Sequence, residues 1–337
     1  MNIAHKIYLG WQDLMNNKSD PRTTNWFLMS SPLPTIMICL SYVYIVKVVG
    51  PKFMENRKPF KLRKFIIFYN FLQVLFSAYL FYEVAFSGWL SHYNWRCQPV
   101  DRSQSESAIR MIYVSWWYYF SKFTEFFDTF FFVLRKRYDQ VSTLHVIHHG
   151  IMPFSVWWGV KFMPGGHSTF FALLNTFIHV IMYTYYMIAA IGPEMQKYLW
   201  WKKYLTILQM IQFCGISTHA FQLFVSNPCN YPIVFSYWIG GHGVLFFFLF
   251  KNFYKQAYKH NNKLKDDTDI NGNAVNGSKF TSINGNDTSS TNDFNQINGI
   301  STFNGIKTEL KSSFDILNCG NRKESIESEI IEYKKDL

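Results

Sequence analysis

Apolar segments long enough to cross a lipid bilayer constrain this chain more than any other feature of its sequence. A membrane-spanning helix needs roughly 20 mostly apolar residues. Seven segments approach or exceed this length: residues 33–49, 65–86, 111–134, 141–163, 169–191, 205–225 and 233–254. We therefore predict an all-α, polytopic membrane protein with seven transmembrane helices.

The composition of the chain changes after about Tyr258. The preceding residues hold most of the Trp, Phe and Leu, whereas the rest is rich in Asn, Ser, Gly and Lys. A segment of the second kind cannot bury enough apolar surface to offset the entropy of ordering. We predict an N-terminal segment at 1–32, a membrane domain at 33–258 and a disordered tail at 259–337.

Lys and Arg are distributed unequally between the connections of the predicted helices. Seventeen follow the first, third, fifth and seventh segments, and seven lie on the opposite side. This excess marks the cytoplasmic side, so we expect a lumenal N-terminus and a cytosolic C-terminus. The same pattern and contact with anionic lipid account for the net charge of +11, and no residue spacing supports nucleic-acid binding.

The last residues suggest a location. Lys334 and Lys335 resemble the di-lysine retrieval signal of endoplasmic-reticulum membrane proteins, although lysines also occur near chain ends by chance. We expect a multi-pass protein of the endoplasmic-reticulum membrane.

Ionisable residues within the apolar segments are the first candidates for a functional site, because each costs roughly 2.5–3.5 kcal/mol to insert. Lys122, Glu125 and Asp128 recur at intervals of three, which keeps them on one side of a helix. They could form a binding site, or an ion pair that only fixes the packing of helices.

A histidine cluster follows in the fourth segment. His145, His148 and His149 occupy positions i, i+3 and i+4, and so lie on one helical face. Imidazoles placed in this way can bind a metal, relay protons or attack a carbonyl. A single histidine of this kind is usually a structural core residue, but three on one face are unusual for that role.

Two further polar groups lie in the next two segments. The fifth segment carries a stripe at helical spacing, formed by Asn175, His179, Tyr183 and Tyr186. The sixth carries Gln209 and Gln212, and buried amides of this kind commonly form hydrogen bonds between membrane helices.

In this order, the clusters resemble the ELO family of very-long-chain fatty-acid elongases. The resemblance covers about residues 26–258 and includes the seven-span topology. The matching segments are Lys122-Phe-Thr-Glu125-Phe-Phe-Asp128-Thr129, His145-Val-Ile-His148-His149, His179-Val-Ile-Met182-Tyr183-Thr-Tyr185-Tyr186, Thr206-Ile-Leu-Gln209-Met-Ile-Gln212-Phe213 and Arg57-Lys58-Pro59-Phe60.

The resemblance implies an acyltransferase that condenses a long-chain acyl-CoA with malonyl-CoA to give a 3-oxoacyl-CoA, CO2 and CoA. His148 is then the expected nucleophile, His145 and His149 would orient it or move protons, and His179 would lie near the second thioester. Glu125 and Asp128 would orient Lys122. The residues expected to bind substrate are Lys122, Glu125, Asp128, Asn175, Tyr183, Tyr186, Gln209 and Gln212.

The same resemblance sets further expectations. The helices would enclose the alkyl chain in a tunnel, and the reaction would need no metal and no organic cofactor. The expected partners are the two CoA substrates, membrane lipids and the other enzymes of the elongation cycle.

Two other classes of protein share part of this pattern. Membrane desaturases and hydroxylases with two iron ions also contain HxxHH, but they need several such boxes. The remaining histidines of this chain are isolated: His5, His92, His167, His179, His219, His242 and His260. A seven-helix receptor or transporter is the second alternative, because Asn227 to Tyr231 match NPxxY, although this pattern precedes the last span.

Two of the five cysteines are candidates for a disulfide. Cys97 and Cys229 both lie in connections predicted to be lumenal, and the lumen is oxidising. Two free thiols more than about 7 Å apart remain the alternative. Cys39 and Cys214 lie within predicted spans, where buried apolar roles are common.

Overall fold

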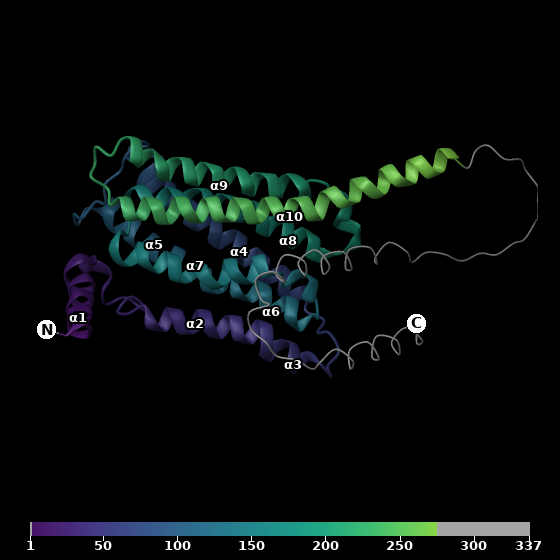
Figure 1. The fold of residues 1–337 in the computed structure, drawn as a ribbon, viewed down its shortest axis with the longest axis horizontal. Coiled ribbons are helices and arrows are strands. Elements are labelled where there is room, and N and C mark those ends of the chain that lie inside the picture. Colours follow the sequence, from purple (N-terminus) through teal and green to yellow (C-terminus); the bar gives the residue numbers. More distant parts are fainter. Residues whose placement is uncertain (1, 275–337) are drawn as a thin grey trace, which may run out of the picture. The chain divides into compact units, whose positions relative to one another are not determined.

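The computed structural model describes residues 2–274, and describes side chains through residue 257. Every regular element among these residues is a helix (Figure 1). The bounds of the α-helices are α1 Ile3–Asp13, α2 Leu33–Tyr44, α3 Gly50–Met54, α4 Arg63–Val84, α5 Glu106–Thr124, α6 Phe126–Leu134, α7 Thr143–Phe162, α8 Thr169–Ile191, α9 Lys202–Val225 and α10 Ile233–Ala274.

A helical segment occupies each of the seven apolar stretches predicted from the sequence. Short π-helical turns extend two of them, since Ile45–Val49 joins α2 to α3 and Ala85–Trp89 continues α4. Four segments are long and apolar enough to cross a membrane: Leu33–Met54, Arg63–Trp89, Gly166–Ile191 and Ile233–Ala257. The fold is therefore that of a multi-pass membrane protein.

The other three helical segments, formed by α5 with α6, by α7 and by α9, contain three of the polar clusters found in the sequence. These polar side chains lower the mean hydropathy of the helices that carry them.

The structure divides after Thr268, and the unit Met1–Thr268 contains all of α1 to α9. Helix α10 continues to Ala274, past the predicted start of the tail at 259. The predicted tail lies outside the described residues from 275 onward, so its disorder stays a prediction.

Within the first unit, the long helices run side by side, and α1 lies crosswise near the end of α2 (Figure 1). Helix α4 packs most extensively against α8, and α7 packs against both α2 and α5. Helices α8 and α9 also pack together. In this arrangement most of the residues predicted to form the site are buried or partly buried, whereas Tyr186 is exposed.

Two local features position the polar residues of α5 and α7. Ser142 caps α7 by accepting a hydrogen bond from the backbone N–H of His145, at 3.2 Å, which places the histidine cluster in the first two turns. Glu125 is the single residue between the end of α5 and the start of α6. Its side chain therefore projects from a break in the helix rather than from a regular turn.

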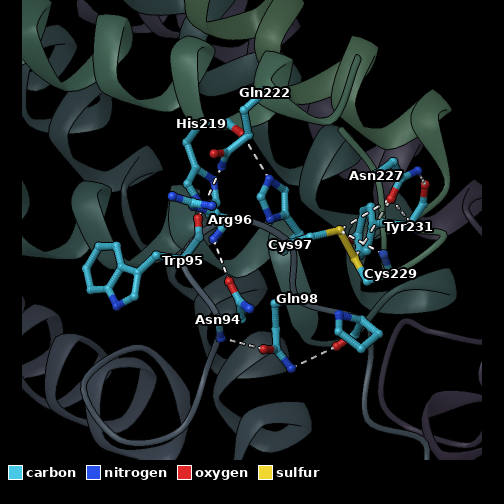
Figure 2. The surroundings of a disulfide bond; sticks show 12 residues. Asn94, Trp95, Arg96, Cys97, Gln98, His219, Gln222, Asn227, Cys229 and Tyr231 are labelled. Atoms are coloured by element: carbon cyan, nitrogen blue, oxygen red, sulfur yellow. Dashed lines mark hydrogen bonds between the residues drawn. A yellow bond between two sulfur atoms is a disulfide. The ribbon is translucent and has the colours of Figure 1, made fainter. Parts of the chain in front are cut away.

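A disulfide ties two distant connections together at one end of the bundle (Figure 2). It joins Cys97, between α4 and α5, to Cys229, between α9 and α10, with Cα atoms 5.8 Å apart. That separation is within the usual range for a disulfide. Asn227 supports the same connection, because its side chain donates to the Tyr231 carbonyl and accepts from the Tyr231 N–H, both at 2.8 Å.

Residues 97–100 also lie against the turn that precedes α8. The backbone N–H of His167 donates to the carbonyl of Gln98 at 2.8 Å. Gly166 has φ of 65°, and a Cβ there would lie 2.9 Å from the backbone of Pro99. The close approach of the two chains and the left-handed conformation both require glycine at this position.

Candidate active site

Lys122 lies at the centre of the polar side chains in the bundle. It is only 2% exposed, and its Nζ donates to Glu125 Oε1 at 2.6 Å and to Asn175 Oδ1 at 3.0 Å. The same Asn175 oxygen accepts a hydrogen bond from the Tyr118 hydroxyl at 2.8 Å. Residues from α5 and α8 thus hold the ammonium group in a defined place.

Glu125 connects this lysine to two of the predicted catalytic histidines. Its Oε1 lies 3.4 Å from His179 Nδ1, and its Oε2 lies 3.7 Å from His149 Nδ1. Nε2 of His179 is 3.2 Å from the side-chain amide of Asn175. One buried carboxylate therefore faces Lys122, His149 and His179 together.

The three histidines of α7 have different surroundings. His145 Nε2 is hydrogen-bonded to Thr129 Oγ1 at 2.8 Å, and Thr129 in turn contacts the Tyr42 hydroxyl at 2.8 Å. The ring of His149 is 4.4 Å from that of His145 and 5.2 Å from that of His148. His145 is thus held by α2 and α6, and His149 lies between it and Glu125.

His148 faces a cavity of about 30 Å³ that Lys122, Asn175 and His242 also line. The ring of Phe246 packs edge-on against it at 4.6 Å between centroids. Its buried Nδ1 has no hydrogen-bond partner among the described residues. Of the three histidines on α7, His148 is the one that a molecule in this cavity would meet.

Asp128 does not orient Lys122, contrary to our expectation from the sequence. It accepts a hydrogen bond from the Tyr183 hydroxyl at 2.9 Å instead. Tyr186 packs against Tyr183 with 6.0 Å between centroids and is 38% exposed. These three residues form a layer next to the cluster around Glu125, and α6 and α8 supply them.

The two glutamines of α9 have no contact with the histidine cluster among those the structure describes. Gln209 donates to the Met182 sulfur at 3.5 Å, and Gln212 is buried. Neither is among the residues that line the cavity next to His148.

Sequence reasoning missed His242 as a site residue. It comes from α10, and its Nδ1 is 2.7 Å from the backbone carbonyl of Trp238. Its buried Nε2 has no partner within the described part of the chain, and the residue lines the cavity that His148 faces. The available signal was an ionisable residue inside an apolar segment, which is a functional candidate even when it is isolated.

Metal ligation requires several donor side chains to converge on one point. Within the described residues, no group of three or more His, Cys, Asp and Glu side chains is placed to hold a metal ion. Nε2 of His145 is already hydrogen-bonded to Thr129 Oγ1.

Comparison with known proteins identifies the family to which the chain belongs. The model of the ELO family, described as the GNS1/SUR4 family, matches residues 27–266. The chain belongs to the ELO family. The match includes all of α2 to α9, and therefore every predicted catalytic and substrate-binding residue.

Relatives of this ELO protein include three that carry the name very long chain fatty acid elongase. Elongase 7 of Drosophila melanogaster is 67% identical over 275 residues, which cover 81% of this chain and 84% of the relative. Elongase 7 of Rattus norvegicus is 55% identical, covering 73% and 88% of the two chains. Elongase 1 of Homo sapiens is 49% identical, covering 75% and 91%.

Proposed function

We propose that this protein is the condensing enzyme of very-long-chain fatty-acid elongation. It joins an acyl-CoA to malonyl-CoA and releases CO2, CoA and a 3-oxoacyl-CoA. Its sequence identity with named elongases over most of the chain supports fatty-acid elongation. The observation that carries the condensation step is the cavity shared by His148, Lys122 and Asn175.

His148 acts as the nucleophile in the first half of the reaction. A nitrogen of the neutral imidazole attacks the thioester carbonyl of acyl-CoA, the C–S bond breaks, and CoA leaves as its thiolate. The cationic acyl-imidazole that remains keeps the acyl group reactive. His149 lies beside His148 and faces Glu125, which gives it a position to move a proton.

Lys122 and Asn175 serve the second half of the reaction. Decarboxylation of malonyl-CoA leaves a carbanion equivalent whose charge spreads onto its thioester oxygen, and the Lys122 ammonium and the Asn175 amide can stabilise that oxygen. The new carbon nucleophile takes the acyl group from His148 and restores the imidazole. Glu125 fixes Lys122 and His179 for this step.

The alkyl chain occupies a tunnel within the bundle. The cavity next to His148 is followed by an apolar cavity of about 70 Å³ and a smaller one of about 10 Å³. Phe171 and Ile239 border all three. Cavities that share lining residues are neighbours, which supports one continuous path for a substrate.

The protein crosses the endoplasmic-reticulum membrane seven times, with its N-terminus in the lumen and its C-terminus in the cytosol. The four candidate spans support a multi-pass arrangement, and the three polar helical segments would bring the number of crossings to seven. Large apolar side chains on α4, such as Phe65, Phe68 and Leu75, are exposed and suit contact with lipid. The enzyme needs no metal or organic cofactor and works with the other enzymes of the elongation cycle.

The test is condensation by purified protein supplied with stearoyl-CoA and malonyl-CoA. We expect a 3-oxoacyl-CoA and an equal amount of CO2 from wild-type protein, and neither from His148→Ala. The control is His92→Ala, because His92 lies in the connection between α4 and α5, away from the cavity. Wild-type activity in His148→Ala would contradict the proposal.

A further inference from the structure

The smallest of the three cavities, of about 10 Å³, contains polar atoms that the proposed reaction does not use. His167, His219 and Ser236 line it, together with apolar residues of α8 to α10. His167 is 3% exposed and Ser236 is 2% exposed. Nδ1 of His167, Nε2 of His219 and Oγ of Ser236 are all buried, and none has a hydrogen-bond partner among the described residues.

The hydroxyl groups that line the neighbouring apolar cavity are already bonded. Ser115 donates to the Met111 carbonyl at 2.7 Å, and Thr169 donates to the Gly166 carbonyl at 2.7 Å. Ser155 accepts a hydrogen bond from Trp238 Nε1 at 2.8 Å. Unpartnered polar atoms therefore distinguish the third cavity from the second.

The hydrogen bonds of the two histidines define what the third cavity offers. His167 Nε2 lies 2.9 Å from the carbonyl of His219, to which it donates. The ring of His219 hydrogen-bonds to the backbone of Trp95, and Figure 2 shows this residue near the 94–98 connection. A neutral imidazole that donates through one nitrogen accepts through the other. The free nitrogens are thus acceptors, and Ser236 can donate or accept.

A group that enters this cavity must therefore carry a hydrogen-bond donor. An alcohol fits, since its O–H can donate to an imidazole nitrogen while its oxygen accepts from Ser236. A methyl group would leave all three protein atoms without partners, and a carboxylate would oppose its oxygens to two acceptors. The ring of His219 is fixed by stacking. Its centroid lies 3.9 Å from that of Phe170 and 4.0 Å from that of His167.

The third cavity also adjoins the cavity that His148 faces. It shares Phe171 and Ile239 with the other two cavities, and Ser168 and Phe235 with the second. Asn175 lines the cavity of His148, and Ser168 lies about 10 Å further along α8 at the rise of an α-helix. A chain bound at His148 that runs along α8 toward Ser168 would bring its ω-end to the two stacked histidines.

We propose that the His167–His219–Ser236 cavity binds a hydroxyl group at the ω-end of the acyl chain, so that ω-hydroxyacyl-CoA is a substrate class of this protein. The inference rests on the proposed function, because the chain must be attached near His148 for its other end to reach the cavity. It adds a requirement of matching length, since one chain length places the hydroxyl among the three polar atoms.

The test compares ω-hydroxyacyl-CoAs with their methyl-ended counterparts, from hexanoyl to arachidoyl length, on the wild-type protein. We expect the ratio of kcat/KM values to reach a maximum at one length. At shorter lengths the hydroxyl stops in the apolar cavity without a partner, and the ratio should fall about 10-fold or more. The ω-carboxyacyl-CoAs should show no such maximum.

Two variants locate the effect. Ser236→Ala and His219→Phe should each lower the ratio at the maximum about 3- to 10-fold, the effect of losing one hydrogen-bond partner. Ser77→Ala, a buried serine of α4 that lines none of the three cavities, should leave the ratio unchanged.

A flat ratio across the wild-type length series overturns the inference and indicates that the cavity holds only water. That result is separate from failure of the proposed function, in which no acyl-CoA of either kind would be elongated. The length series needs no variant, so a folding defect in Ser236→Ala does not affect it.

Discussion

Buried polar side chains gather in two regions of this protein, around Glu125 and around the Cys97–Cys229 disulfide. Around Glu125 the contacts join side chains to one another, as in the pairs that Glu125 forms with Lys122 and with His179. Around the disulfide, a covalent bond and hydrogen bonds to the backbone hold the chain, such as those from His167 to Gln98 and between the Asn227 side chain and Tyr231.

This difference in the kind of contact indicates different roles for the two regions. Side-chain contacts can rearrange when a substrate supplies new partners, whereas a covalent bond and backbone hydrogen bonds persist. Changes around Glu125 should therefore reduce activity more than stability. Changes around the disulfide should reduce stability and leave the chemistry of the folded enzyme intact.

Replacing Glu125 should produce the largest effect. Glu125→Gln keeps the size of the side chain but removes the charge that faces Lys122, His149 and His179. We expect kcat/KM to fall at least about 100-fold, as for displacement of groups that must be aligned for reaction. Steady-state kinetics of the condensation reaction gives kcat/KM for the variant and the wild-type protein.

The matched control is Glu83→Gln, which breaks an ion pair with Arg110 away from the cavities. It should change kcat/KM little. Equal losses in the two variants would contradict the special position of Glu125.

Removing the disulfide should produce the largest loss of stability in the second region. The double variant Cys97→Ser with Cys229→Ser should lower the free energy of unfolding by about 2–5 kcal/mol. Thermal unfolding in detergent measures this loss, and a reductant should destabilise the wild-type protein in the same way. Condensation per folded molecule should be kept.

Cys214→Ser is the control, because Cys214 is a free and exposed cysteine. A double variant with the same melting temperature as the wild-type protein would show that the disulfide does not stabilise this end of the bundle.

Tyr183→Phe should have a smaller effect near the site. It removes the hydroxyl that donates to the buried Asp128. Loss of one such partner should cost about 1–3 kcal/mol of stability and reduce kcat/KM less than Glu125→Gln does. Tyr237→Phe, at an exposed position, serves as the control for melting and activity. A greater activity loss in Tyr183→Phe than in Glu125→Gln would reverse the assigned order.

The smallest effect concerns acid stability of the segment before α2. Burial raises the pKa of Asp20, but the hydrogen bonds and charge of Arg22 outweigh this, so the pKa lies below its usual value. Asp20 accepts from Arg22 Nη2 at 2.7 Å, and Arg22 also donates to the carbonyl of Ser103 at 2.8 Å. This contribution is present above the pKa of unfolded Asp20 and is lost as pH falls through the folded-state pKa.

Melting temperature measured against pH tests this assignment. The wild-type protein should lose stability more steeply on acidification than Asp20→Asn, whereas the exposed Asp139→Asn should follow the wild type. Identical slopes in all three proteins would contradict it.

The sequence predicted the positions of the helical segments because apolar length and helical spacing are local properties. The same spacing predicted that His145, His148 and His149 share a face, and the structure brings His149 of this group to within 3.7 Å of Glu125. The polar residues of α5 and α8 also meet, as Lys122 and Asn175 show.

The partners of several residues could not be predicted, because they depend on how neighbouring helices rotate and pack. Asp128 bonds to Tyr183 of α8 rather than to a residue of its own helix. Glu125 gains its central position from the break between α5 and α6. His242 reaches the cavity of His148 from α10, nearly a hundred residues away.

The central claim is that His148 carries the acyl group between the two substrates. The most direct measurement is mass spectrometry of the intact protein and its peptides after incubation with stearoyl-CoA and no malonyl-CoA. We predict release of free CoA and a stearoyl group on the peptide that contains His148, with the group disappearing when malonyl-CoA is added. Release of CoA only in the presence of malonyl-CoA, or a stearoyl group on another residue, would contradict the account.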